Sequence, residues 1–216
     1  RIALTSLVEA MCLAASQTLQ IEEGELSGNW SPVLGGGQME MHLFLYDLLP
    51  GGAGYTRLVK QQIQDVFTNA ESLLASCSCE TSCYRCLRHY ANNIYHASLD
   101  RHLALALLRY LVYEDIPKLT EEERKEAFIQ FVELLRLKEI AGEQQVVRDG
   151  VSIPLVIYRS DGSEIWVDTH HSLIVADQSE SDVRALAESE MVEFYSLDAF
   201  TLRHDLPNAF AQLQLF

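Results

Sequence analysis

Residues 76–86, SCSCETSCYRC, contain four of the five cysteines in this 216-residue chain. Their spacing is C-x-C-x3-C-x2-C, and four thiolates this close in sequence can converge on one tetrahedral ion if the backbone turns twice. The Ser, Glu and Thr residues between them are compatible with such turns. The spacing therefore favours one structural Zn²⁺ ion, with the candidate ligands Cys77, Cys79, Cys83 and Cys86.

Other uses of the cysteines remain open at the level of sequence. An iron–sulfur cluster, redox-sensing thiols or unliganded cysteines are alternatives to zinc. A disulfide framework is disfavoured, because the chain is otherwise poor in cysteine and shows no secretory signal. One catalytic thiol would not require four clustered cysteines. A closed four-cysteine zinc site has no position for a substrate water, so we expect no catalytic residue in this chain.

The composition describes a globular chain rather than a disordered one, with 48% hydrophobic and 22% charged residues. The formal net charge of −15 argues against a surface that binds nucleic acid throughout. The apolar run over residues 103–113 is too short to cross a membrane and is interrupted by Arg109. We expect a cytoplasmic protein without membrane contact. Because Arg1 already lies within an apparent helix, we also expect an excerpt from a longer protein.

The hydrophobic periodicity predicts a mixed α/β fold with a helix-rich first part. Cys12 lies on the apolar stripe of the first predicted helix and is expected to be a core residue. Residues 29–38, NWSPVLGGGQ, predict a loop. Ser98 is the predicted N-cap of the helix that follows the cysteines, and Thr120 with Glu123 predicts a capping box. The predicted helices cover residues 5–19, 55–75, 99–113 and 120–141, with a strand over residues 39–49.

After residue 142 the predicted secondary structure changes from mainly helices to mainly strands. Residues 151–158 and 164–168 flank RSDGS and predict a hairpin, because Asp-Gly tolerates positive φ. Further strands are predicted over residues 173–176 and 191–195, a helix over 182–188, and one or two short helices at the end. We therefore expect a zinc-binding domain over residues 1–142 and a smaller, acidic, strand-rich segment over residues 143–216.

Two stretches in the first domain are candidates for phosphate or nucleic-acid contact. In LPGGAGY, Gly51, Gly52 and Gly54 lie where a strand passes into a helix, and backbone N–H groups there can bind an anion. A tight turn, with Asp47 as its cap, is the favoured alternative. Beside the cysteines, Arg85 and Arg88 alternate with tyrosines, a combination that can hold a phosphate and stack a base. Packing and ion pairing are again favoured over contact with nucleic acid.

Asp168 and His170 share one face of a predicted strand by the period of two. Together they could hold a divalent metal, but a single D-x-H pattern is common, and a structural role is favoured. With Asp47 and the glycine turn, this pair defines the enzyme alternative: a nuclease-like or phosphate-processing site. A module that only binds a protein partner through the acidic segment is the second alternative.

The order of motifs resembles a known family. Asp47 with PGGAGY, then a helix, the four cysteines and CLRHYANNIYHASLDRHLALALLRYL, is similar to the MrfA-type zinc-binding C-terminal domain. This domain occurs in superfamily-two DEAD/DEAH-box helicases of the Mrf/Hrq1-like group and in helicase-like proteins of DISARM and Druantia anti-phage systems. The likeness covers residues 1–112 approximately.

The resemblance implies a function for the chain. Cys77, Cys79, Cys83 and Cys86 would ligate zinc in a C-terminal module of an ATP-dependent DNA helicase or helicase-associated protein, in DNA repair or anti-phage defence. The module would order a surface that guides DNA or docks a subunit, and its partners would be the motor domains, DNA through the parent protein and a possible further subunit. No Walker A lysine loop or DEAD/DEAH box is present, so the motor would lie outside this sequence.

Overall fold

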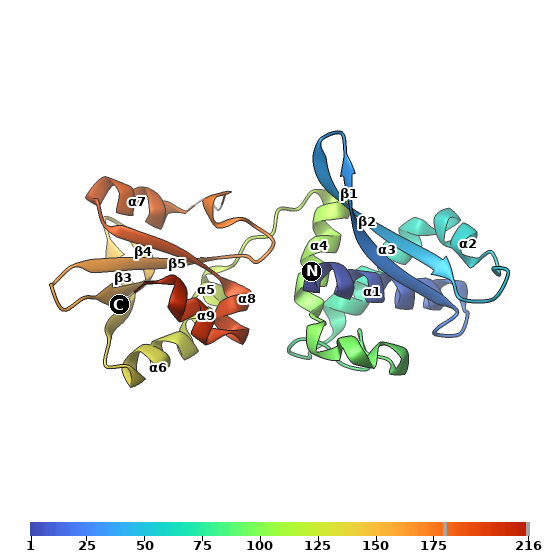
Figure 1. The fold of residues 1–216 in the computed structure, drawn as a ribbon, viewed down its shortest axis with the longest axis horizontal. Coiled ribbons are helices and arrows are strands. Elements are labelled where there is room, and N and C mark those ends of the chain that lie inside the picture. Colours follow the sequence, from blue (N-terminus) through green and yellow to red (C-terminus); the bar gives the residue numbers. More distant parts are fainter. Residues whose placement is uncertain (179–180, 215–216) are drawn as a thin grey trace. The chain divides into compact units, whose positions relative to one another are not determined.

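The structure is a computed structural model that describes residues 1–178 and 181–214. It divides into two compact units, Arg1–Ile116 and Pro117–Phe216, which we call the first and the second unit (Figure 1). Each has its own helices and its own sheet. The mixed α/β class expected from the sequence is therefore confirmed, with the four cysteines in the first unit.

The division lies between residues 116 and 117, not between 142 and 143 as the sequence suggested. The intervening helices, α5 (Glu121–Ala127) and α6 (Ile129–Leu137), share a core with the second sheet. Phe128 and Phe131 lie in that core, and both are fully buried. Helical periodicity shows that a helix has an apolar face but not which sheet will cover it, and this is why the boundary was misplaced.

Helix α1 (Ile2–Leu19), predicted over residues 5–19 from its periodicity, is the centre of the first unit. Helices α3 (Ile63–Ser76) and α4 (Arg101–Tyr113) both pack against it. Among the described residues, α1 is the one helix long and apolar enough to cross a membrane, but its apolar side chains are those of a core helix. A buried hydrogen bond from the Asp100 backbone N–H to Ser6 Oγ, 2.8 Å long, joins the two ends of the unit.

Strands β1 (Leu26–Gly35) and β2 (Gln38–Asp47) form an antiparallel hairpin against α1. The loop predicted over residues 29–38 was therefore wrong, since only Gly36 and Gly37 make the turn. Their φ angles of 57° and 86° fit a two-residue hairpin turn with positive φ at both positions. The strand was missed because the outer part of the hairpin lacks the alternation of a half-buried strand; Leu34 and Met39 are 74% and 63% exposed.

Two helix boundaries also differ from expectation. The helix predicted over residues 55–75 is broken at Gln62 into α2 (Tyr55–Gln61) and α3. The N-cap of α4 is Asp100, whose Oδ1 accepts the N–H groups of His102 and Leu103 at 2.9 Å each. Ser98, the predicted cap, ends the short helix η1 (Tyr90–Ser98) instead. An aspartate two residues later offers the same capping acceptor, and the sequence pattern did not separate the two.

The second unit contains a four-stranded sheet of order β3-β4-β5-β6. The predicted hairpin is confirmed as β4 (Val151–Tyr158) and β5 (Glu164–His170), and β3 (Ala141–Arg148) extends it on the other side of β4. Helix α7 (Asp182–Glu190) then leads to β6 (Glu193–Asp198), which runs parallel to β5. The strand predicted over residues 173–176 is absent: a turn and the short helix η2 (Ala176–Gln178) occupy this region.

Helices cover both faces of this sheet. Leu155 and Val167 face a core shared with α6 and with the C-terminal helices α8 (Ala199–His204) and α9 (Leu206–Gln212). Val156 and Trp166 point to the opposite face, where α7 covers them. Burial on both faces explains why β4 and β5 read as continuous apolar runs in the sequence. The capping box predicted for Thr120 and Glu123 is present at the start of α5.

Candidate metal centre

The four clustered cysteines lie in a loop that begins where α3 ends. Cys77 is the C-cap of α3, and from there the chain leaves the helix in an extended conformation. The loop then turns back, so that backbone N–H groups of residues 86–88 all reach the Cys83 carbonyl oxygen at 3.0–3.1 Å. As a result the four Sγ atoms come together, and all lie within 4.8 Å of one another.

The separations of the sulfur atoms fit a single tetrahedral metal ion. Four Zn–S bonds of about 2.3 Å place neighbouring sulfur atoms about 3.8 Å apart. Cys77 Sγ lies 3.4 Å from Cys79 Sγ and 3.5 Å from Cys83 Sγ. Cys86 Sγ lies 3.6 Å from Cys79 Sγ and 3.8 Å from Cys83 Sγ. A cluster of several iron atoms would hold the thiolates farther apart. The donor set and its geometry therefore fit zinc.

A disulfide does not explain this arrangement. A disulfide requires about 2.05 Å between its sulfur atoms, and each of these four separations exceeds that by more than 1 Å; all four cysteines are free. Cys12, the fifth cysteine, is also a free thiol and is buried on α1. Burial, with a smaller contribution from Glu9, raises the pKa of Cys12 to about 12. Cys12 is thus a buried and unreactive thiol, as the sequence predicted, although it lies outside the cluster of packed core residues.

The cluster needs a cation to hold four thiolates. The backbone N–H of Arg85 donates to Cys83 Sγ at 3.4 Å and lowers the pKa of that thiol to about 6. Burial raises the pKa of Cys79 and, much more strongly, of Cys86. Burial thus disfavours a thiolate at Cys86, and a nearby positive charge would offset that cost. A divalent metal held by Cys77, Cys79, Cys83 and Cys86 would supply that charge and favour the thiolate form of these side chains.

Arg101 connects the loop that contains the four cysteines (residues 77–86, the metal loop) to the helices on either side of it. This role was not predicted from the sequence. Arg101 Nε donates to the Cys79 carbonyl oxygen at 2.7 Å, and its Nη1 donates to the Leu74 carbonyl oxygen at 3.1 Å. Its backbone N–H also reaches the Thr81 carbonyl oxygen at 2.7 Å. One signal was available: arginine is the first residue of α4, where the helix dipole disfavours a cation. Such a position indicates that the side chain has a specific partner.

A second network ties the segment after the cysteines to α1. Glu9 Oε2 accepts His89 Nε2 and Asn92 Nδ2, both at 2.9 Å. Asn92, only 2% exposed, also donates to the Leu87 carbonyl oxygen at 2.8 Å. His96 Nε2 lies 2.9 Å from Asn92 Oδ1. The conformation of η1 is thus determined by polar side chains rather than by a large apolar core.

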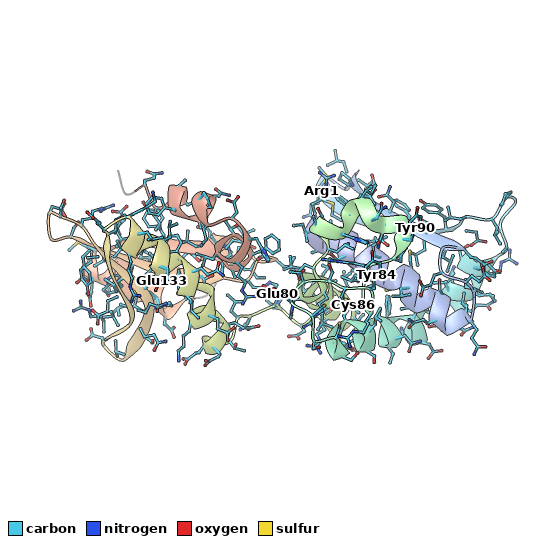
Figure 2. All side chains as sticks on the ribbon, turned by 90° about the horizontal axis from the view of Figure 1, so that it is seen from below. Arg1, Glu80, Tyr84, Cys86, Tyr90 and Glu133 are labelled. Carbon is cyan, nitrogen blue, oxygen red and sulfur yellow. The ribbon has the colours of Figure 1, made fainter. Side chains whose placement is uncertain are left out.

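The basic and aromatic candidates beside the cluster lie partly at the surface. Tyr84 and Tyr90 are 72% and 89% exposed, and Figure 2 shows them with Cys86 in the same unit. Arg85 is exposed, whereas Arg88 is half-buried and donates from Nε to Ser82 Oγ at 2.9 Å. Contact between these residues and nucleic acid remains a prediction.

The glycine turn is capped by Asp47, as the favoured interpretation of the sequence held. Asp47 Oδ2 accepts the N–H groups of Gly54 and Tyr55 at 2.6 and 3.2 Å, and Oδ1 accepts that of Thr56 at 3.0 Å. Desolvation opposes the charge, but these backbone donors outweigh it and lower the pKa of Asp47. The first N–H groups of α2 are therefore already bonded to a carboxylate of the protein. Phosphate contact by Gly51, Gly52 or Gly54 also remains a prediction.

The Asp168 and His170 side chains lie in the second unit and bind different partners. Asp168 is 2% exposed; its Oδ2 accepts Ser181 Oγ at 2.6 Å and lies 3.5 Å from an Arg124 Nη2. His170 Nδ1 lies 2.8 Å from Ser196 Oγ. Among the described residues, the four-cysteine cluster is the one group of three or more metal-binding side chains found together. These partners are consistent with the structural role favoured for the pair.

Residues 7–87 match the family model of the MrfA Zn-binding domain. Over these residues the first unit is similar to the MrfA Zn-binding domain. The match ends one residue after Cys86, so it includes all four cysteines, and with the sulfur geometry it supports a zinc site here. The resemblance that we drew from the sequence is confirmed. Helix α4 and Arg101 lie beyond the matched residues.

One curated relative is similar to nearly the whole chain. The chain is 30% identical over 214 residues to the Druantia protein DruE of Escherichia coli strain UMEA 4076-1. The alignment covers 96% of this chain but 11% of the relative, so the chain spans about one tenth of that protein's length. The second unit, which the family model does not cover, is therefore included in the likeness to DruE. No solved structure matches the chain.

Proposed function

We propose that the first unit is a structural zinc module of a helicase-like protein in anti-phage defence, and that it orders a surface for a DNA strand or a partner subunit. The observation that carries the proposal is the convergence of four cysteine sulfur atoms in one loop. The Arg101 side chain holds this loop by hydrogen bonds to the carbonyl oxygen of Cys79, within the loop, and to that of Leu74, in α3. With its ligands so arranged, zinc would cross-link the end of α3 to the loop over residues 79–86, which Arg101 in turn connects to the start of α4.

A structural role for the metal is supported by the number of its ligands. Four cysteines fill a tetrahedral coordination sphere and leave no position for a reacting water. In such a site the metal contributes to folding free energy rather than to a reaction. We therefore propose that any ATP hydrolysis and strand separation belong to motor domains elsewhere in a longer protein, located in the cytoplasm.

Anti-phage defence is supported by the likeness to DruE and is preferred to DNA repair for that reason. The short span of the match in DruE is compatible with this chain being an accessory part of a much larger assembly. The motor domains would then be its nearest partners.

The surface beside the metal loop has the side chains that single-stranded DNA requires. Tyr84 and Tyr90 are exposed rings on which bases can stack, and Arg85 is an exposed cation for the backbone. The surrounding charge limits the affinity: residues 1–116 carry 7 basic and 12 acidic side chains, a formal charge of −5. We expect the isolated chain to bind DNA weakly and in a salt-dependent manner.

A titration of a labelled single-stranded oligonucleotide at several salt concentrations tests the DNA-guiding role. In a variant with both Arg85→Ala and Arg88→Ala, affinity should fall and the slope of log K against log salt should become shallower by about 1.4. The matched control is Arg57→Ala, which replaces an exposed arginine on α2. It should leave the affinity and the salt dependence unchanged. Zinc content must be equal in all three proteins. If the double variant binds like the parent chain, this surface does not guide DNA.

Docking of a protein partner is the second candidate, and the charge of the second unit favours it. Residues 117–216 carry 9 basic and 19 acidic side chains, a formal charge of −10 on a compact unit. Such a surface suits a basic partner. Removing residues 117–216 should abolish the complex and leave the zinc content of the first unit unchanged, because the metal loop and its Arg101 contacts all lie before Ile116. Loss of zinc on truncation would contradict this.

A further inference from the structure

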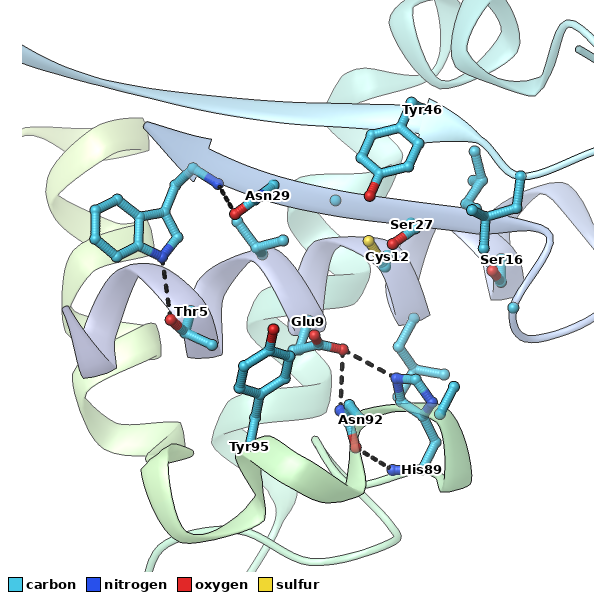
Figure 3. A pocket seen from close by; sticks show the side chains of 18 of the residues that line it. Thr5, Glu9, Cys12, Ser16, Ser27, Asn29, Tyr46, His89, Asn92 and Tyr95 are labelled. Atoms are coloured by element: carbon cyan, nitrogen blue, oxygen red, sulfur yellow. Dashed lines mark hydrogen bonds and ion pairs between the residues drawn. The ribbon is translucent and has the colours of Figure 1, made fainter. Parts of the chain in front are cut away.

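The first unit contains a pocket that the zinc module does not explain. Its volume is about 560 Å³, within the range of ligand sites. The outer face of α1 is its floor, including Thr5, Glu9 and Cys12, while β1 and η1 form opposite walls (Figure 3). None of the four clustered cysteines lines it.

The floor presents a carboxylate oxygen that is open to a ligand. Glu9 Oε2 is engaged by His89 and Asn92, which hold the side chain in place. Its Oε1 accepts none of the hydrogen bonds seen among the described residues, although the side chain is only 14% exposed. Glu23 adds a second carboxylate to the lining. A preorganised, largely desolvated acceptor of this kind binds a charged donor strongly.

Aromatic rings also line the pocket. Figure 3 shows Glu9 on α1 next to Tyr95 of η1, while Tyr46 of β2 lies farther away, near Cys12. Both tyrosines are 44% exposed, and Trp30 of β1 also lines the pocket. The Trp30 indole is held in place by a hydrogen bond from Nε1 to Thr5 Oγ1 at 3.0 Å. Faces of tyrosine and tryptophan attract cations, and a planar guanidinium also stacks on them.

We infer that this pocket binds an arginine side chain of a partner protein, with the guanidinium donating to Glu9 Oε1 and packed against Tyr95. Arginine is favoured over lysine because its planar fork both donates and stacks, whereas the ammonium is compact and strongly hydrated. Nucleic acid is the less suitable occupant, since two carboxylates, Glu9 and Glu23, line the pocket against one arginine, Arg1. The inference is independent of zinc and of the DNA-guiding role.

The test is a titration of the zinc-loaded chain with N-acetyl-argininamide, followed by NMR at the Trp30 indole N–H and at the Asn92 side-chain amide. The compound should shift both signals in a saturable manner at millimolar concentrations. The neutral isostere N-acetyl-citrullinamide should bind about tenfold more weakly, because it cannot form the charge-assisted contact with Glu9. Equal shifts with the two compounds, or none with either, would overturn the inference.

Two variants test whether N-acetyl-argininamide binds in this pocket. Glu9→Gln keeps the shape of the side chain and should weaken argininamide about tenfold. Tyr95→Leu removes the ring without touching the hydrogen bonds of Glu9, so it remains informative if the Glu9 variant folds poorly. Asp65→Asn, an exposed acid on α3 outside the pocket, is the control and should bind like the parent chain. If a single-stranded oligonucleotide displaces argininamide from the parent chain, the pocket is a nucleic-acid site and the inference is wrong.

Discussion

Arg101 Nε donates a hydrogen bond of 2.7 Å to the carbonyl oxygen of Cys79, a candidate metal ligand 22 residues earlier in the chain. The same guanidinium reaches the last turn of α3 through Leu74. The conformation of the metal loop is therefore set by a residue that binds no metal. Such support from outside the ligand set commonly decides how well a site holds its ion.

Arg101→Lys should destabilise the first unit by about 2 kcal/mol, because one ammonium cannot reproduce both hydrogen bonds to the loop and to α3. The variant should also release zinc faster to a chelator. Chemical denaturation and a competition assay with a zinc-binding dye measure the two effects. Arg57→Lys, at an exposed position on α2, should change neither. Unchanged zinc release in Arg101→Lys would show that the loop holds its shape without this contact.

Cys86→Ser should reduce the bound zinc from about one ion per chain to well below that, since the remaining three sulfur atoms leave the coordination sphere open. The metal content of the purified protein is the measurement. Cys12→Ala removes the one cysteine outside the cluster and should leave zinc content unchanged. Equal metal content in Cys86→Ser and the parent chain would exclude this residue as a ligand.

Asp47→Ala should loosen the start of α2 without affecting zinc. The backbone N–H groups of Gly54, Tyr55 and Thr56 lose their acceptor and should exchange faster with solvent, as measured by amide hydrogen exchange. The native pKa of Asp47 lies below the ordinary 3.8, so its contribution is complete above that pH and is lost as the pH falls through the lower native value. Protection that persists in Asp47→Ala would show that the cap is unnecessary.

The second unit should lose stability as the pH falls below about 6.5. Burial lowers the pKa of His170 and of His171, so the unfolded chain takes up protons at a higher pH than the native protein does. Thermal unfolding followed by Trp166 fluorescence, in a Trp30→Phe background, reports on this unit alone, since the chain has two tryptophans. His170→Gln should reduce the pH dependence. A midpoint independent of pH between 5 and 7 would contradict the prediction.

The sequence predicted those features whose signal is local. Apolar periodicity located α1, the Asp161-Gly162 pair located the turn between β4 and β5, and the spacing of the cysteines was sufficient to propose the metal site. Each depends on residues only a few positions apart. The resemblance of the whole motif order, which the family match confirmed, added the functional context.

Features that depend on distant partners were not predictable in the same way. The outer part of β1 pairs with β2 through backbone groups while its side chains remain exposed, so its residues carry no amphipathic pattern. Arg101 binds main-chain carbonyl groups, which every residue possesses, so the sequence gives no indication of its acceptors. Likewise, the pocket around Glu9 arises only when α1, β1 and η1 come together.

The hydrogen bond between Ser6 and Asp100 has a consequence for biosynthesis, because it joins residues 94 positions apart. At about 5–20 residues per second, a ribosome needs roughly 5–20 s to make the partner of Ser6 after Ser6 itself. During that interval α1, the most apolar helix of the unit, has been synthesised but its helical neighbour α4 has not. Until α4 emerges, α1 can pack only against the elements made before α4, namely β1, β2, α2, α3 and η1.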